Sequence, residues 1–355
     1  MESAARRTRR TLAGGVIAVI LAVLVLAACG GSAQGHAAGP ARGGGSGRPA
    51  ASSSSAAPSA PASPDPAGTA GSYSVGERQL TFTEPAHTAA GGQPIGPRTL
   101  VTEVRYPLAQ GSARQPAQGP LPLLVFGPGF LECVDTYGDL LQTWASAGYV
   151  VAAVTFPRTN CQAGTAAYEP DLVNQPADMS FVISSLLDLS AQPHDLFSGL
   201  LNGTEIGAAG QSDGGDTVAA LAASTCCTDH RLKAVAVLSG AEWPAMPGQY
   251  FSGGAPPMLF VQGNADPINP PWASLQLYRL DEAGARYYLN LLGASHMTPY
   301  EGTNPVERVV ARVTLAFFDR YVLGQAGALA AMTRAGTVSG TAALVSGGHV
   351  PADAG

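Results

Sequence analysis

The chain beyond residue 73 alternates short apolar runs with stretches of helical spacing. Two runs in which polar and apolar residues alternate, 78–85 and 99–108, predict a β-hairpin with a turn-rich joint. More strongly apolar runs bounded by turn residues predict further strands, several of them buried on both faces. These runs lie at 120–129, 149–157, 204–210, 232–240, 256–266 and 285–296.

Amphipathic segments between and after these runs predict helices. They cover 135–148, 171–192, 215–224, 272–284 and 304–323. Pro176 suits a helix start and Asp178 a first turn. A hairpin followed by repeated strand–helix units predicts an α/β fold: a mainly parallel sheet with helices on both faces. Such sheets carry their chemistry at the carboxyl ends of the strands, so the residues just past each run are the candidates.

The first 29 residues are typical of an export signal. Arginines precede an apolar stretch, 11–28, that ends in Leu26-Ala-Ala-Cys29. This ending resembles the bacterial lipobox, in which the cysteine receives the lipid, so we expect a lipid-anchored protein on the outer side of the cell membrane. An uncleaved membrane anchor and simple secretion are the alternatives. The arginines also resemble a twin-arginine signal faintly, but the strongly apolar stretch favours the general secretory route.

Composition divides the rest of the chain. Residues 30–72 are almost entirely Ala, Gly, Ser and Pro, which predicts a disordered tether. Residues 73–324 hold the predicted elements, and the tail 325–355 lacks a clear period and indicates no role. The chain carries 19 basic and 25 acidic residues without a run of Lys, which argues against binding to nucleic acid or electrostatic docking on anionic lipid.

The chain has five cysteines, whose number and positions predict disulfides in the exported domain. If Cys29 carries lipid, four remain in an oxidising compartment. Cys133 and Cys161 each follow a predicted strand, which makes them a candidate disulfide. Cys226 and Cys227 would then be joined to each other or free. A zinc site is disfavoured because the spacing lacks paired C-x-x-C units.

A candidate nucleophile stands in Gly210-Gln211-Ser212-Asp213-Gly214. In a chain with 44 Gly the G-x-S-x-G pattern alone is weak. Its context is more informative, because a strand enters Ser212 and a helix leaves it, as in a nucleophile elbow. The alternative is an ordinary glycine-rich turn.

A serine hydroxyl requires a general base, and the base requires an acid to orient it. Of the six His residues, His296 alone follows a strand near the C-terminal end of the domain, and Asp266 follows the preceding strand. The order Ser212, Asp266, His296 is that of an α/β-hydrolase triad. Asp281 and Glu282 are rival acids, but they lie at the end of a helical segment.

Two backbone N–H groups are candidates for an oxyanion hole. One belongs to Asp213, the residue after the nucleophile, and the other to Phe130, which follows Gly127-Pro128-Gly129 at a strand end. The ring of Phe130 would lie beside the substrate, although it could instead cap the sheet. This chemistry requires neither a metal nor an organic cofactor.

Together these residues resemble the α/β-hydrolase superfamily over about 73–324. Within it they are most similar to the branch of dienelactone-hydrolase-like proteins, chlorophyllases, platelet-activating-factor acetylhydrolases and cutinase-type polyester hydrolases. The carriers are "LPLLVFGPGF", "WASAGYVVAAVTFP", "GAAGQSDGG", "RLKAVAVLSGAEW", "PPMLFVQGNADPINP" and "LLGASHMTPY". The resemblance implies that Pro128-Gly129-Phe130 is the oxyanion loop and that Trp243 flanks the substrate.

The departures from the family concern the nucleophile's neighbours. Gln211 and Asp213 stand where many relatives have His and an apolar residue, and Ser212 replaces the Cys of true dienelactone hydrolases. We therefore expect a serine carboxylester hydrolase, acting on an uncharged or lipophilic ester, and not dienelactone hydrolysis itself. The alternatives are a non-catalytic surface lipoprotein on the same scaffold, a peptidase, or an acyltransferase with the same triad.

Overall fold

The computed structural model of the chain describes residues 71–89, 91–282, 284–351 and 354. The predicted signal peptide with Cys29, and the predicted tether up to residue 70, lie outside the described residues. No helix in these ranges is both long enough and apolar enough to span a bilayer.

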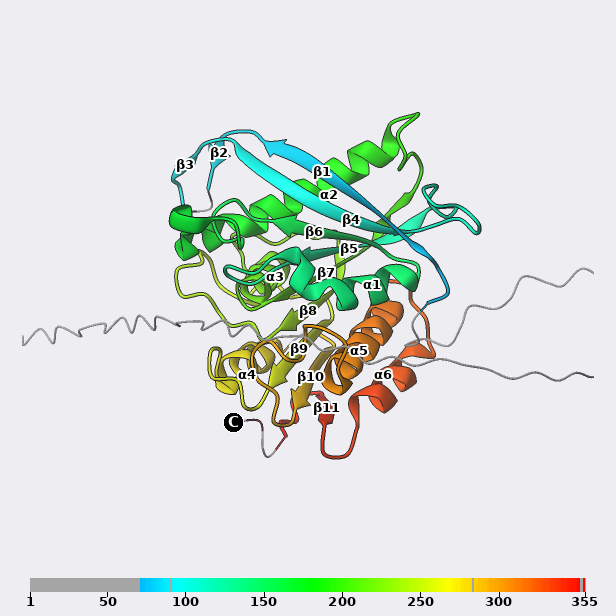
Figure 1. Ribbon diagram of the computed structural model, residues 1–355. Coiled ribbons are helices and arrows are strands. Elements are labelled where there is room, and N and C mark those ends of the chain that lie inside the picture. Colours follow the sequence, from blue (N-terminus) through cyan, green and yellow to red (C-terminus); the bar gives the residue numbers. More distant parts are fainter. Residues whose placement is uncertain (1–70, 90, 283, 352–353, 355) are drawn as a thin grey trace, which may run out of the picture. The chain divides into compact units, whose positions relative to one another are not determined.

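A mixed, mostly parallel sheet forms the centre of the domain (Figure 1). Strands β6, β5, β7, β8, β9 and β10 are mutually parallel, whereas β4 and β11 run opposite to their inner neighbours and β1 pairs antiparallel with β4. In spatial order the strands are β1 (Val75–Glu84), β4 (Arg98–Pro107), β6 (Val150–Thr155), β5 (Leu121–Gly127), β7 (Leu201–Gln211), β8 (Leu232–Leu238), β9 (Met258–Gly263), β10 (Arg286–Leu291) and β11 (Ala342–Ser346). The expected α/β class, with its antiparallel hairpin, is confirmed.

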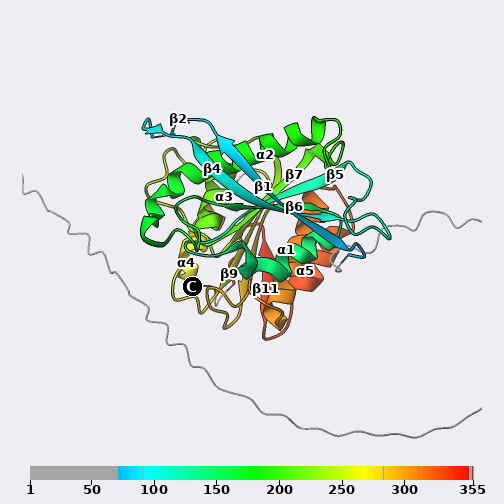
Figure 2. The same cartoon turned by 45° about the horizontal axis from the view of Figure 1, so that its top comes forward.

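Helices cover both faces of this sheet (Figures 1 and 2). They are α1 (Gly138–Ser146), α2 (Gln175–Ala191), α3 (Asp213–Ala223), α4 (Pro271–Leu280), α5 (Pro305–Tyr321) and α6 (Ala328–Gly336). Because side chains alternate across a strand, Val125 faces the core under α2, α3 and α4 while the adjacent Phe126 faces α1, α5 and α6. Two apolar cores therefore fill the domain, one on each side of the sheet.

The connections add short elements. The joint between β1 and β4 holds a two-stranded ribbon, β2 (His87–Thr88) with β3 (Pro94–Ile95). Short 3₁₀ helices are η1 (Val134–Tyr137), η2 (Gly164–Ala166) and η3 (Glu169–Asn174). The last of these corrects the expected helix 171–192, because the chain is 3₁₀ up to Asn174 and α-helical only from Gln175. Pro176 and Asp178 do occupy the first turn of α2.

Buried ion pairs fix the segment before α2. The Arg98 guanidinium contacts Asp178 at 2.6 Å and Asp171 at 2.8 Å, and all three side chains are less than 10% exposed. Burial raises the pKa of Asp178 to about 7 although Arg98 opposes the shift. This triad ties β4 to both η3 and α2, and η3 packs against α3.

The tail after Gly324 belongs to the folded domain, although its sequence pattern indicates no role. Helix α6 packs against α5, and β11 adds an antiparallel strand to β10, with Leu344 opposite Leu289. The tail thus covers the edge of the sheet that β10 would otherwise expose.

Candidate functional site

Three predicted residues lie at the carboxyl ends of parallel strands. Ser212 directly follows β7, Asp266 lies three residues beyond β9, and His296 lies five residues beyond β10. Because these strands are parallel, their carboxyl ends share one edge of the sheet. The fold therefore brings all three residues to the same edge.

The backbone at Ser212 has the geometry of a strained turn. Its φ is 54° and its ψ is −122°, a conformation that L side chains rarely adopt, and its peptide leads directly into α3. A Cβ on Gly214 would lie 1.8 Å from the carbonyl oxygen of Gly127, and one on Gly210 would lie 2.0 Å from that of Gly214. Both glycines are therefore required by the close approach of β5, β7 and α3. They make a sharp strand–helix turn with a half-buried serine at its tip.

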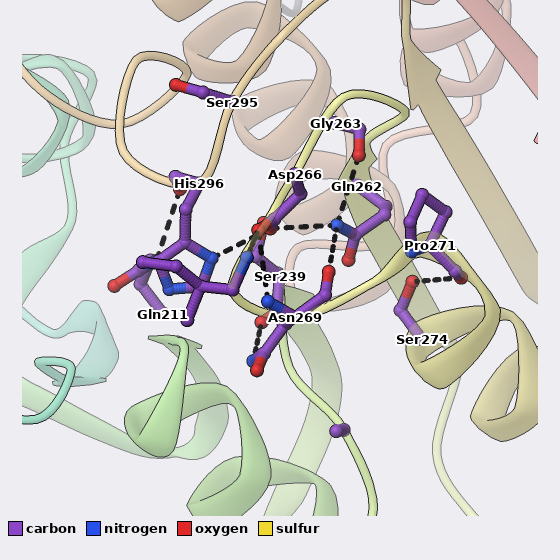
Figure 3. A network of polar contacts seen from close by, with 12 residues as sticks. Gln211, Ser239, Gln262, Gly263, Asp266, Asn269, Pro271, Ser274, Ser295 and His296 are labelled. Atoms are coloured by element: carbon purple, nitrogen blue, oxygen red, sulfur yellow. Dashed lines mark hydrogen bonds and ion pairs between the residues drawn. The ribbon is translucent and has the colours of Figure 1, made fainter. Parts of the chain in front are cut away.

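His296 and Asp266 form a buried acid–base pair (Figure 3). The Nδ1 of His296 lies 2.7 Å from Asp266 Oδ2. Asp266 also accepts hydrogen bonds from the N–H groups of Ile268 and Asn269 and from the Gln262 amide. Burial opposes the charge on Asp266, but the hydrogen bond and electrostatic attraction of His296, together with the N–H of Ile268 and the amide of Gln262, outweigh it and hold the pKa of Asp266 below its ordinary value. An ionised Asp266 favours the tautomer with the imidazole proton on Nδ1, in which Nε2 is unprotonated and can accept a proton.

Gln211 connects this pair to the nucleophile turn. Its Nε2 lies 3.2 Å from His296 Nε2, and its neighbour in the chain is Ser212. Ser212 and His296 thus belong to one site, although no hydrogen bond joins Ser212 Oγ to the imidazole among the described residues. Catalytic hydrogen bonds of this kind often form only when substrate is bound.

The loop after β5 lies against the nucleophile turn. A Cβ on Gly129 would lie 3.1 Å from the Cβ of Ser212. Leu131, with a φ of 59°, donates its N–H to Thr159. In the described part of the chain neither Phe130 nor Asp213 donates its backbone N–H to a protein acceptor, the latter because it is the first residue of α3. Neither predicted oxyanion donor is therefore occupied by an intramolecular hydrogen bond in these ranges.

Disulfides join the cysteines that the structure describes. Cys133 pairs with Cys161, with Cα atoms 5.1 Å apart, which links the loops after β5 and β6 as expected. Cys226 pairs with its neighbour Cys227, which decides between the two states left open by the sequence. A cavity of about 280 Å³ lies beside the first of these loops, lined in part by Pro128, Gly129 and both cysteines of the longer bridge.

Carboxyl groups crowd the start of α3. Burial, with a contribution from Glu169, raises the pKa of Asp213 to about 7, and burial raises that of Asp216 well above its ordinary value. Asp216 accepts a hydrogen bond from Ala241 N–H, whereas Asp213 Oδ2 is buried without a donor among the described residues. The unusual residue after the predicted nucleophile is thus a carboxyl group that resists ionisation.

The other predicted residues have different surroundings. Trp243 packs with Leu172, Met246 and the Cys226–Cys227 pair in a small apolar cluster beside α3. The rival acid Asp281 ends α4, where its carbonyl accepts a hydrogen bond from Arg286. Neither Asp281 nor Glu282 is paired with His296 in the described ranges.

Several residues of the site carry no signal in the sequence. Tyr137 bonds to Gln211, Gln262 bonds to Asp266, and Asn269 donates to both Asp266 and the carbonyl of Ser239. Ser239 follows β8 with a φ of 48°, a third non-glycine residue with positive φ at this edge after Leu131 and Ser212. Gln262 and Asn269 flank Asp266 at a strand end, but nothing in their spacing distinguishes them.

Comparison of the chain with protein-family models and with curated proteins finds no match. Among the described residues, no group of three or more His, Cys, Asp or Glu side chains is arranged to hold a metal ion. The geometry of the strand-end site is therefore the feature that indicates a function.

Proposed function

We propose that the chain is a serine carboxylester hydrolase with the α/β-hydrolase fold. The observation that carries this proposal is the strained Ser212, at a strand–helix turn, adjoining a buried pair in which His296 Nδ1 lies 2.7 Å from Asp266 Oδ2. Backbone strain of this kind concentrates at functional sites, because it lowers stability and persists only where the surrounding structure enforces it. The conformation of Ser212 therefore favours a functional role over a purely structural one.

The proposed reaction proceeds in two halves. Ser212 Oγ attacks the ester carbonyl carbon while His296 Nε2 takes its proton, and the N–H groups of Phe130 and Asp213 stabilise the oxyanion. Collapse of the tetrahedral intermediate breaks the bond to the leaving alcohol, which receives the proton from His296. Water, deprotonated by His296, then attacks the acyl-enzyme and releases the acid and Ser212.

The direct test is covalent labelling with a fluorophosphonate probe, coupled to hydrolysis of a short-chain p-nitrophenyl ester. The wild-type chain should be labelled at Ser212 and should hydrolyse the ester. Ser212→Ala should lose both while its circular dichroism spectrum stays unchanged. Turnover by Ser212→Ala at the wild-type rate would overturn the assignment.

The proposal also includes a lipid anchor at Cys29, which lies outside the described residues. It is supported by the apolar stretch and the Leu-Ala-Ala-Cys ending alone. Expression in a bacterial host with radiolabelled palmitate should label the wild-type chain and not Cys29→Ala. Equal labelling of both would overturn the anchor without affecting the hydrolase assignment.

A further inference from the structure

The side chain of Gln211 lies at the junction of two predicted parts of the site. It is fully buried at the end of β7, one residue before the nucleophile. Its Oε1 lies 2.8 Å from Tyr137 Oη, and its Nε2 lies 3.2 Å from His296 Nε2 and 3.4 Å from the His296 carbonyl oxygen. Tyr137 Oη in turn lies 3.1 Å from the backbone nitrogen of Gly129. One chain of hydrogen bonds therefore runs from the oxyanion loop to the imidazole.

The donors and acceptors along this chain are mutually consistent. The hydroxyl of Tyr137 accepts the N–H of Gly129, so its own hydrogen points to Gln211 Oε1. The amide N–H groups of Gln211 then face two acceptors, the carbonyl oxygen of His296 and its unprotonated Nε2. The opposite orientation of the amide would set Oε1 against that carbonyl oxygen, which would leave both without a donor.

Packing leaves this chain little freedom. Tyr137 is fully buried and its ring contacts Phe126, with centroids 4.8 Å apart. A Cβ on Gly129 would lie 2.7 Å from Gln211 Oε1 and 3.3 Å from Tyr137 Oη, so the loop backbone rests directly on the two side chains. A shift of the Gln211 amide would therefore move the oxyanion loop as well as the imidazole.

We propose that Gln211 and Tyr137 are positioning residues that hold the oxyanion loop and the base in register. This inference depends on the proposed serine hydrolase function. Neither side chain reacts: Gln211 acts through the ring of His296, and Tyr137 acts through Gly129 and the adjacent N–H of Phe130. The Gln211 contact to Nε2 must yield to Ser212 when the proton is transferred, but the bond to the His296 carbonyl oxygen can persist.

The test is a double-mutant cycle on ester hydrolysis with Gln211→Leu, Tyr137→Phe and the combined variant. Active sites are first counted by titration with a fluorophosphonate, so that unfolded protein does not enter the rate. Each single variant should lower kcat on the order of 10-fold to 100-fold while KM changes by less than about 3-fold, because misplacement affects the transition state. The double variant should lose little more than the worse single one, since both cut the same chain.

The matched controls remove a buried glutamine amide and a buried tyrosine hydroxyl that do not belong to this chain of hydrogen bonds. Gln175 is a fully buried Gln bonded to Thr159 and Thr217, and Tyr149 is a buried Tyr bonded to Asp319. Gln175→Leu and Tyr149→Phe should leave kcat per active site unchanged. Additive losses in the cycle, equal losses in the controls, or faster acylation in Gln211→Leu would each overturn the positioning role. A wild-type chain that takes up no probe at Ser212 would instead overturn the hydrolase function itself.

Discussion

Asp266 accepts a hydrogen bond from His296 Nδ1 at 2.7 Å and holds three further donors around the same carboxylate. Replacement by Asn would let the amide donate to Nδ1 and force the proton onto Nε2, the wrong tautomer for a base. We therefore expect Asp266→Asn to lower kcat for a p-nitrophenyl ester by about 10³-fold to 10⁴-fold. Asp281→Asn, at the rival acid, should retain the wild-type rate. A large loss in Asp281→Asn with little loss in Asp266→Asn would instead make Asp281 the residue that orients His296.

Burial of Asp213 predicts a pH-dependent cost to stability. Its ordinary pKa of 3.8 rises to about 7 in the folded chain, so below pH ~4 the carboxyl is protonated in both states and costs nothing. As the pH rises towards 7 the unfolded chain loses the proton first, and stability falls until the full cost is present above pH ~7. Asp213→Asn should therefore raise Tm relative to wild type more at pH 8 than at pH 4.5.

Calorimetry of both proteins at the two pH values measures this difference. The same substitution at the exposed Asp188 is the control, for which the change in Tm should be small and similar at both values. A difference for Asp213→Asn that does not grow with pH would contradict the raised pKa.

The closeness of Gly214 to the loop after β5 predicts a steric cost. A methyl group at this position would meet the Gly127 carbonyl oxygen at 1.8 Å, and backbone on both sides cannot yield without moving β5 or α3. We expect Gly214→Ala to lower the free energy of unfolding by at least about 1–3 kcal/mol. Urea denaturation measures it. Gly327→Ala, where the added carbon meets nothing within 4 Å, should leave the free energy nearly unchanged.

Among these variants, we expect the largest loss of stability from removing the Arg98 guanidinium, which lies between Asp171 and Asp178. Arg98→Met would leave two buried carboxyl groups without their counter-charge, at a cost of about 3–5 kcal/mol. The more exposed pair of Arg78 with Asp195 is the comparison, and Arg78→Met should cost no more than about 1 kcal/mol. Equal midpoints of urea denaturation for the two variants would show that burial of the Arg98 pairs contributes little.

Strand ends were the part of the site that sequence could predict. Ser212, Asp266 and His296 each follow an apolar run, and parallel strands bring such positions together whatever the details of packing. The boundaries of α2 were less predictable, because nothing in the sequence around Asp171 distinguishes a 3₁₀ turn stabilised by Arg98, 73 residues away, from a first helical turn.

The remaining features depend on contacts between distant segments. The bond from Tyr137 to Gln211 spans 74 positions and forms only because the fold brings the side chain of Tyr137 to the end of β7. The pairing of Cys226 with Cys227 was one of two states consistent with the count of cysteines. Strand β11 was missed because its five residues, Ala-Ala-Leu-Val-Ser, show no alternation of polar and apolar types, so its assignment depends on pairing with β10.

The position of β11 has a consequence for the order in which the domain is completed. The outer edge of β10 has no strand partner until residues 342–346 have been synthesised, and an open edge pairs readily with strands of other molecules. The chain is therefore exposed to self-association until residues 342–346 have paired with β10. Shortening the chain before Ala342 would make that temporary state permanent.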